Sequence, residues 1–283
     1  MTPSPVGSAS RRDRWPLQLR RRHDLGGEPA DAAHSGGGAA VTGAAGTRRS
    51  VFELRQYTTV PGERDTLIDL FDSHLVTGQE AVGMHVIGQF RDLDDPDRFV
   101  WMRGFDSMPA RAAALRAFYG GPVWQSHRGA ANATMADSDN ALLLRPIELG
   151  PAYPDFGART ELDPRVPNSV VGVTVLFNDG PLADTSITKV TKVVLPQLRA
   201  AGGVPVAVFV TDPSDNNFPA LPLRQEDVLV WVTRFADDPA WAEHHQHLAS
   251  SPIWQDEVIP WLAATSRPSQ ELRLRPTAGS QLR

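Results

Sequence analysis

The sequence predicts an α+β protein built from two ferredoxin-like β-α-β-β-α-β units. Two observations carry this prediction. Strand and helix patterns follow one another in that order twice after residue 50. The two halves also share uncommon residues at a constant spacing of 130 positions, as with Trp101 and Trp231 or Trp124 and Trp254.

Five segments follow from these patterns along the 283 residues. The opening segment is rich in Pro, Ser, Ala and Gly, a composition typical of disorder. A second stretch rich in Pro, Gly and Asp separates the two units. The expected segments are a disordered tail over 1–49, the first unit over 50–148, a linker over 149–168, the second unit over 169–276 and a C-terminal tail over 277–283.

Period-two alternation predicts the strands, and apolar residues at helical spacing predict the helices. The first unit is expected to have strands at 51–58, 84–91, 98–105 and 141–147 and helices starting at Pro61 and Pro109, the second of which ends before Gly120 and Gly121. The second unit is expected to have strands at 170–177, 204–211, 228–235 and 270–274 and helices at 184–200 and 239–262.

Composition and charge exclude several classes of function. The chain has no cysteine, which excludes disulfides, iron–sulfur clusters and thiolate zinc sites. The net charge is −5, and because residues 1–50 hold eight arginines and only four acidic residues, the remainder is more acidic still. We therefore expect no nucleic-acid partner. No apolar run approaches the roughly 18 residues of a membrane span, so we expect no membrane partner and a cytoplasmic location.

Three sequence features together resemble the NIPSNAP family, within the superfamily of dimeric α/β barrels. They are the strand Glu53-Leu54-Arg55-Gln56-Tyr57 followed by Pro61-Gly62, the strand-then-helix pattern of Trp101–Pro109, and Pro122-Val123-Trp124-Gln125, which is echoed by Pro252-Ile253-Trp254-Gln255. The resemblance covers 51–147 well and 169–276 more loosely. The second unit has Val171-Gly172-Val173-Thr174-Val175 in place of the first motif.

This resemblance implies two four-stranded sheets packed face to face, with helices on one face of each sheet and the barrel interior on the other. Relatives bind heme in such folds or carry out cofactor-free oxygenation and small-ring chemistry. Closure of the barrel within one chain and closure between the two chains of a homodimer both remain open.

The first strand carries the candidate catalytic residues. Alternation places Glu53, Arg55 and Tyr57 on one face and Phe52, Leu54 and Gln56 on the other. We expect the apolar set to face the helices and the polar set to line the barrel, where it would bind a carboxylate or enolate and relay a proton. The alternative is a structural Glu–Arg pair with Tyr57 as an amphipathic filler.

Further candidates concern substrate binding. Trp101, Arg103 and Phe105 share one face of the third strand, and Trp231, Thr233 and Phe235 share the equivalent face. An aromatic wall with one arginine suits a flat, anionic or polyketide-like ligand, although duplicated tryptophans are more often packing residues. His85 is a separate candidate proton shuttle.

Three clustered histidines, His244, His245 and His247, are expected to lie on a helix surface, and they do not make the i, i+4 metal pair of a zinc helix. Ligation of heme by one of them is an alternative, because some relatives use a histidine of the second unit. We expect no metal and no cofactor. The prediction is an enzyme that oxygenates, isomerises or cyclises an apolar or polyketide-like metabolite in the barrel; the alternatives are a ligand carrier, an interaction scaffold or a heme-binding barrel.

Overall fold

The computed structural model describes residues 49–147, 165–265 and 267–283. The predicted N-terminal tail, apart from residue 49, and most of the predicted linker lie outside these residues. Within the described ranges, no helix is long and apolar enough to cross a membrane.

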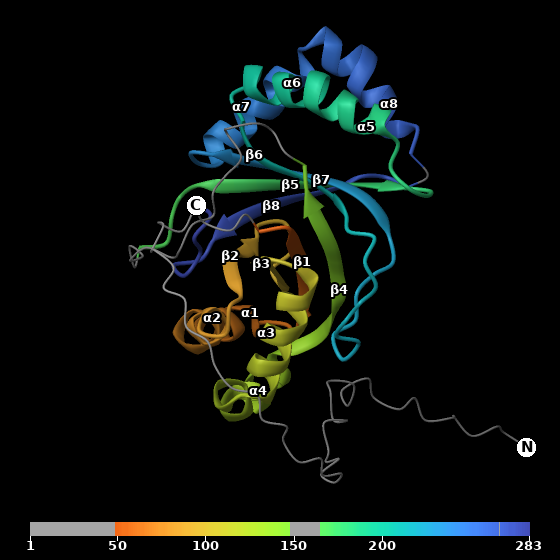
Figure 1. The fold of residues 1–283 in the computed structure, drawn as a ribbon. Coiled ribbons are helices and arrows are strands. Elements are labelled where there is room, and N and C mark those ends of the chain that lie inside the picture. Colours follow the sequence, from red (N-terminus) through yellow and green to blue (C-terminus); the bar gives the residue numbers. More distant parts are fainter. Residues whose placement is uncertain (1–48, 148–164, 266) are drawn as a thin grey trace, which may run out of the picture. The chain divides into compact units, whose positions relative to one another are not determined.

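Eight antiparallel strands close into a single barrel, in the order β1-β3-β2-β8-β5-β7-β6-β4 (Figure 1). The strands are β1 (Val51–Thr59), β2 (His85–Asp92), β3 (Arg98–Phe105), β4 (Met135–Pro146), β5 (Val170–Asn178), β6 (Val204–Thr211), β7 (Asp227–Phe235) and β8 (Gln270–Pro276). Each unit contributes four neighbouring strands in the same internal order. The predicted fold class is confirmed, and the barrel closes within one chain.

Two short ladders join the units. β2 pairs with β8 from Phe90 to Asp92, and β4 pairs with β6 from Leu144 to Pro146. β4 begins at Met135, six residues before the predicted start, and its first residues pair with the end of β1 at Thr58 and Thr59. The first residues of β4, Met-Ala-Asp-Ser-Asp-Asn, are mostly polar and have no strand pattern. They form a strand because they pair with β1.

Helices cover the outer face of each half of the barrel (Figure 1). The first unit has α1 (Arg64–Leu70), a π-helical turn (Phe71–Leu75), α2 (Val76–Glu80), α3 (Met108–Gly120) and α4 (Pro122–Thr134). The second has α5 (Asp184–Lys189), a π-helical turn (Val190–Val194), α6 (Leu195–Ala200), α7 (Asp238–Ala249), a π-helical turn (Trp254–Val258) and α8 (Ile259–Ala263).

Equivalent caps start the equivalent helices α3 and α7. The side chain of Ser107 accepts a hydrogen bond from the Ala110 amide, and Asp237 does the same for Ala240, with a proline in the first turn each time. Helix α4 is absent from the sequence prediction. Gly120 and Gly121 do end α3 as predicted, but Pro122 starts a new helix that Trp124 anchors in the core.

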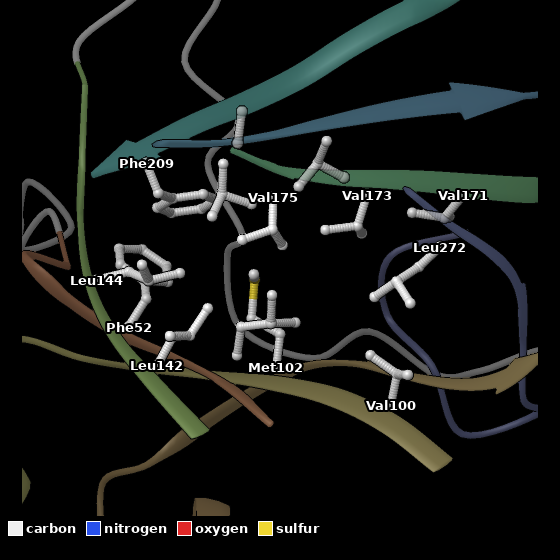
Figure 2. Close-up of a cluster of buried hydrophobic side chains, with 14 of the residues drawn as sticks. Phe52, Val100, Met102, Leu142, Leu144, Val171, Val173, Val175, Phe209 and Leu272 are labelled. Atoms are coloured by element: carbon white, nitrogen blue, oxygen red, sulfur yellow. The ribbon is translucent and has the colours of Figure 1, made fainter. Parts of the chain in front are cut away.

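The barrel interior is filled by apolar side chains from both units, which point toward one another in Figure 2. The rings of Phe52 and Phe209 meet across it at a centroid distance of 5.0 Å. Phe52 and Leu54 were expected to face the helices, and this expectation is wrong. Both sheets have helices on their outer faces, so the space between the sheets is the most water-excluded part of the barrel. The apolar side chains of β1, including Phe52 and Leu54, therefore lie there.

The segment after β8 packs against the first unit. The amide of Thr277 donates to the carbonyl of Gln89, and the amide of Leu282 donates to the carbonyl of Ile87, at 2.9 and 2.8 Å. The amide of Gly279 donates to the Asp72 carboxylate at 2.9 Å. The predicted C-terminal tail is thus a packed segment that extends the contact between the two units.

Candidate functional site

The polar residues of β1 lie beneath the helices of the first unit. Glu53 pairs in register with Arg103, and Arg55 pairs with Trp101. Glu53, Arg55 and Arg103 are fully buried, on the face opposite to the barrel interior. The expectation that Glu53, Arg55 and Tyr57 line the barrel is therefore wrong, because the alternation is right but the faces are exchanged.

Glu53 is the centre of a cluster of three arginines. Its Oε2 accepts hydrogen bonds from Nε and Nη2 of Arg103 at 2.9 and 2.7 Å. The same oxygen accepts from Nη1 of Arg55 at 3.0 Å, and Oε1 accepts from Nε of Arg111 at 2.6 Å. Arg111 comes from α3, so this carboxylate ties a helix to two strands. We call these four residues the charged cluster.

The charged cluster sets the protonation of its own carboxylate. Burial alone would raise the pKa of Glu53, but the positive charges of Arg103, Arg55 and Arg111 outweigh it and hold the pKa well below its usual range. Glu53 is therefore ionised at neutral pH and is a poor proton acceptor.

Aromatic rings surround the charged cluster. The hydroxyl of Tyr57 accepts from Nε of Arg55 at 3.0 Å, and the Tyr57 ring packs edge-on against Trp101. The guanidinium of Arg103 lies over the rings of Trp101 and Phe105, at 4.9 and 5.5 Å from the centroids. The predicted binding residues Trp101, Arg103 and Phe105 thus lie together, but packed against one another.

At the equivalent positions of the second unit, small or aromatic residues replace the charges. Gly172 pairs with Thr233 where Glu53 pairs with Arg103, and Thr174 pairs with Trp231 where Arg55 pairs with Trp101. The position 130 residues beyond Arg111 is Trp241. A Cβ on Gly172 would lie 2.6 Å from a ring carbon of Trp241, so only glycine lets this ring lie on the strand.

The replacement leaves a cavity of about 370 Å³ between the sheet and the helices of the second unit. Aromatic rings and aliphatic side chains form most of its walls, with Trp231, Phe235, Trp241 and Trp254 among them. Thr233 is also in the wall, and its hydroxyl is buried without a hydrogen-bond partner among the described residues. An apolar cavity with a few polar groups is the usual form of a small-molecule site.

His244 from α7 provides the reactive polar group of this wall. It is buried, and its Nδ1 lies 3.2 Å from the carbonyl oxygen of Ala201. Because a carbonyl only accepts, Nδ1 carries the proton and Nε2 keeps its lone pair. Burial lowers the pKa of His244, more than the hydrogen bond to Ala201 raises it, so the imidazole is neutral at neutral pH. The expectation of a surface residue is wrong for His244, which faces the cavity.

The neighbouring His245 behaves differently. Its Nδ1 lies 2.9 Å from the carbonyl oxygen of Trp241, and its Nε2 lies 3.2 Å from the Glu271 carboxylate. The hydrogen bond with Glu271 raises the pKa of His245 and outweighs burial. Both residues line the cavity and are partly exposed. A buried imidazole therefore stands beside a partly exposed pair in which Glu271 favours the protonated form of His245.

The family comparison concerns the first unit. The NIPSNAP family model matches residues 52–149. This region is a NIPSNAP domain. The match contains the charged cluster, and it ends before β5, so the cavity lies in the unit outside the matched region.

Two solved structures with a similar fold extend over both units. An anthrone oxidase-like protein is 11% identical, with a TM-score of 0.55, over 83% of this chain and 96% of its own. A candidate monooxygenase from Fusobacterium nucleatum is 10% identical, with a TM-score of 0.50, over 81% of this chain and 92% of its own. An uncharacterized NIPSNAP domain protein from Burkholderia xenovorans is 16% identical, with a TM-score of 0.33, over 36% of this chain and 98% of its own. No protein of curated function matches the sequence.

The remaining predicted residues divide between the NIPSNAP domain and the cavity. Trp231 lines the cavity. His85, at the start of β2, accepts a hydrogen bond on Nδ1 from Arg49 at 2.9 Å, and its Nε2 lies 3.9 Å from Asp106. Burial, followed by the charge of Arg49, lowers the pKa of His85. Neither the charged cluster nor the cavity wall includes His85. Among the described residues, no group of His, Asp and Glu side chains has the arrangement of a metal site.

Sequence reasoning missed Gly172, Thr174 and Trp241 as determinants of the cavity, as well as the inward face of His244. The spacing of 130 residues does not extend to β1 and β5, and only the strand register sets Glu53 and Arg55 against Gly172 and Thr174. The loss of two long side chains on the strand face beneath a helix indicates a space there.

Proposed function

We propose that the protein is an enzyme that binds a small, flat, apolar molecule in the cavity of the second unit and removes a proton from it with Nε2 of His244. The observation that carries this proposal is the arrangement of His244. Its Nδ1 is held by the Ala201 carbonyl, its imidazole is buried and neutral, and it lies in a wall of tryptophan and phenylalanine rings. A positioned imidazole with a free lone pair is the usual general base of enzymes.

The lining of the cavity favours one class of substrate. Tryptophan rings bind flat apolar molecules, and the unpartnered hydroxyl of Thr233 offers a hydrogen bond to a carbonyl or phenol oxygen. A ring ketone or phenol with a removable proton satisfies both features. Proton loss from such a molecule gives an electron-rich anion that reacts with oxygen or rearranges, in keeping with the predicted oxygenation, isomerisation or cyclisation.

The proposal moves the predicted site from the barrel interior, which is filled, to the layer between sheet and helices. The catalytic role predicted for Glu53, Arg55 and Tyr57 stays a prediction. Heme fits less well than a smaller molecule, because about 370 Å³ is near the lower end of the roughly 300–1,000 Å³ usual for ligand sites. We therefore propose no cofactor.

Anthrone is a suitable first substrate, because it is a flat ring ketone with a removable proton and because the fold resembles that of an anthrone oxidase-like protein. Purified protein in air is expected to convert it to anthraquinone, which absorbance follows. His244→Asn is expected to lower the rate by about 100-fold or more, the usual contribution of a general base. His247→Asn is the matched control, because His247 is exposed on the same helix and does not line the cavity.

A second variant separates binding from proton removal. Thr174→Phe places a ring in the cavity at the position of Arg55 in the first unit, and it is expected to abolish saturable binding of anthrone measured by tryptophan fluorescence. Binding that His244→Asn leaves intact, with no turnover in the wild type on anthrone or other enolisable ring ketones and phenols, would favour the carrier over the enzyme. Unchanged binding of anthrone by Thr174→Phe would show that the molecule does not bind in the cavity. A Soret band in the purified protein would support the heme-binding alternative instead.

A further inference from the structure

The charged cluster of the NIPSNAP domain holds two more positive charges than negative ones. Arg55, Arg103 and Arg111 surround the single carboxylate of Glu53, and all four side chains are fully buried. The other hydrogen-bond acceptors recorded for these guanidiniums are neutral groups, such as the amide of Gln79 and the backbone carbonyl of Ser138. Buried charge without a counter-charge is costly, because the surroundings solvate it far less well than water does.

Donor groups also remain unused in this layer. Nη2 of Arg111 and Nε1 of Trp101 are buried and have no hydrogen-bond partner among the described residues. The side-chain amide of Gln89, directly across β2 and β3 from Trp101, is unpartnered at both its oxygen and its nitrogen. All three side chains are at least 99% buried. Buried polar groups are normally satisfied, so unused donors beside excess positive charge indicate a place for an acceptor with negative charge.

A loop from the second unit covers the charged cluster at Arg111. The side-chain oxygens of Asn216 and Asn217 accept hydrogen bonds from Nη1 of Arg111, at 3.2 and 2.7 Å. Nδ2 of Asn217 also donates to the Met108 carbonyl at 2.6 Å. Both asparagines are half-buried, in the long connection between β6 and β7. Arg111 is thus the member of the charged cluster that the half-buried asparagines of this loop contact.

We propose that the charged cluster of the NIPSNAP domain is a binding site for a small oxyanion, held chiefly by Arg111 beneath the loop of Asn216 and Asn217. Nε and Nη1 of Arg111 already donate to Glu53 and to the two asparagines, so Nη2, which has no partner among the described residues, supplies the N–H donors for an oxygen of a carboxylate, sulfate or phosphate group. The site is separate from the cavity of the second unit, and it binds whether or not the proposed enzyme activity is correct.

The test measures the melting temperature of the full-length protein against added anion, at constant ionic strength set with sodium chloride. Sodium acetate, benzoate, sulfate and phosphate are the probes. A ligand that binds only the folded state stabilises it in a saturable way, so the melting temperature is expected to rise and then level off. Saturation separates binding from the general stabilising effect of sulfate and phosphate, which does not level off.

The decisive variant is Asn217→Asp, which places a carboxylate on Arg111 without removing any arginine. It is expected to abolish the saturable response. The melting temperature without anion is not the readout, because the new carboxylate pairs with Arg111 but loses the hydrogen bond that Asn217 donates to the Met108 carbonyl. Asn140→Asp is the matched control, because Asn140 also accepts from an arginine, Arg224, which already pairs with Glu226. This control is expected to keep the full response.

The probes that give saturation identify the class of anion that binds. Saturation with acetate or benzoate alone identifies an organic carboxylate as the ligand, and saturation with sulfate or phosphate alone identifies an inorganic oxyanion. A wild-type protein whose melting temperature shows no saturable response to any of the four probes overturns the proposal. So does an Asn217→Asp variant that responds as strongly as the wild type, because the response would then come from elsewhere in the molecule.

Discussion

The two units have the same strand order and matching helices, yet the layer between sheet and helices is built in opposite ways. In the first unit this layer holds four buried charges and packed aromatic rings, and in the second it holds a cavity of about 370 Å³. The backbone register is equivalent in the two units, with Glu53 opposite Arg103 and Gly172 opposite Thr233. A few side chains on one strand face therefore decide whether this layer is an ionic core or contains a cavity.

The exchange at one helix position completes the contrast. Arg111 reaches from α3 to the Glu53 carboxylate, whereas Trp241 of α7 lies directly on Gly172. Three residues further along each helix, Ala114 is packed in the first unit and His244 faces the cavity in the second. The first unit therefore fixes its helix through charge, and the second fixes it through ring packing that leaves room for a reactive imidazole.

The largest effect is expected from removing the counter-charge of the first unit. Glu53→Gln leaves three buried arginines without a carboxylate, and we expect the free energy of unfolding to fall by about 3–5 kcal/mol. Urea unfolding followed by circular dichroism measures it. Glu271→Gln in the second unit is the control, because that carboxylate is half-exposed and its pair with His245 is expected to contribute under about 1 kcal/mol. Equal losses in the two variants would contradict the comparison.

An intermediate effect is expected from a matched pair of tryptophans. Trp124 is buried and packs against Phe118 and Tyr119, whereas the equivalent Trp254 is half-buried at the cavity wall. We expect Trp124→Ala to cost about 3–5 kcal/mol of unfolding free energy, and Trp254→Ala to cost at least about 1 kcal/mol less, because part of its surroundings is already open. The same unfolding experiment tests this, and a larger loss for Trp254→Ala would mean that the cavity closes around its ring.

The smallest effect is expected in the pH dependence of stability. Because burial depresses the pKa of folded His244 below the ordinary 6.5, the unfolded chain binds a proton more readily, and the stability that His244 contributes above that pH is lost as the pH falls through the folded pKa. His245, whose pKa is raised by Glu271, opposes this trend, since its contribution is present at low pH and lost as the pH rises through its folded pKa.

The variant His244→Asn isolates its own part of this dependence. It is expected to flatten the fall in unfolding free energy below pH 6.5 by at most about 1.4 kcal/mol per pH unit, the limit for one proton. His247 is exposed on the same helix, and its charge is the weakest of the named influences on the pKa of His244, so His247→Asn is expected to change the slope less than His244→Asn does. An identical slope in the wild type and in His244→Asn would show that His244 is not held neutral by burial.

Much of the fold could be read from the sequence because its signals are local. Alternation places β3 at residues 98–105 and β6 at residues 204–211, and both predicted strands are confirmed without change. Helix α4 and the start of β4 were missed for the opposite reason. The helix contains Gly129 and few apolar residues, and the start of the strand is polar, so both depend on neighbours that are distant in the sequence.

The two-unit α+β architecture, the alternation of Glu53, Arg55 and Tyr57, and the difference between Arg103 and Thr233 can all be read from the sequence. Which face of each strand lies inside the barrel depends on how the two sheets pack. The alternation of side chains along a strand separates two faces, but it does not indicate which face is the inner one when both are buried. The packing of two sheets settles this, because it reserves the barrel interior for apolar side chains and sends the charges of the first unit, and the cavity of the second, beneath the helices.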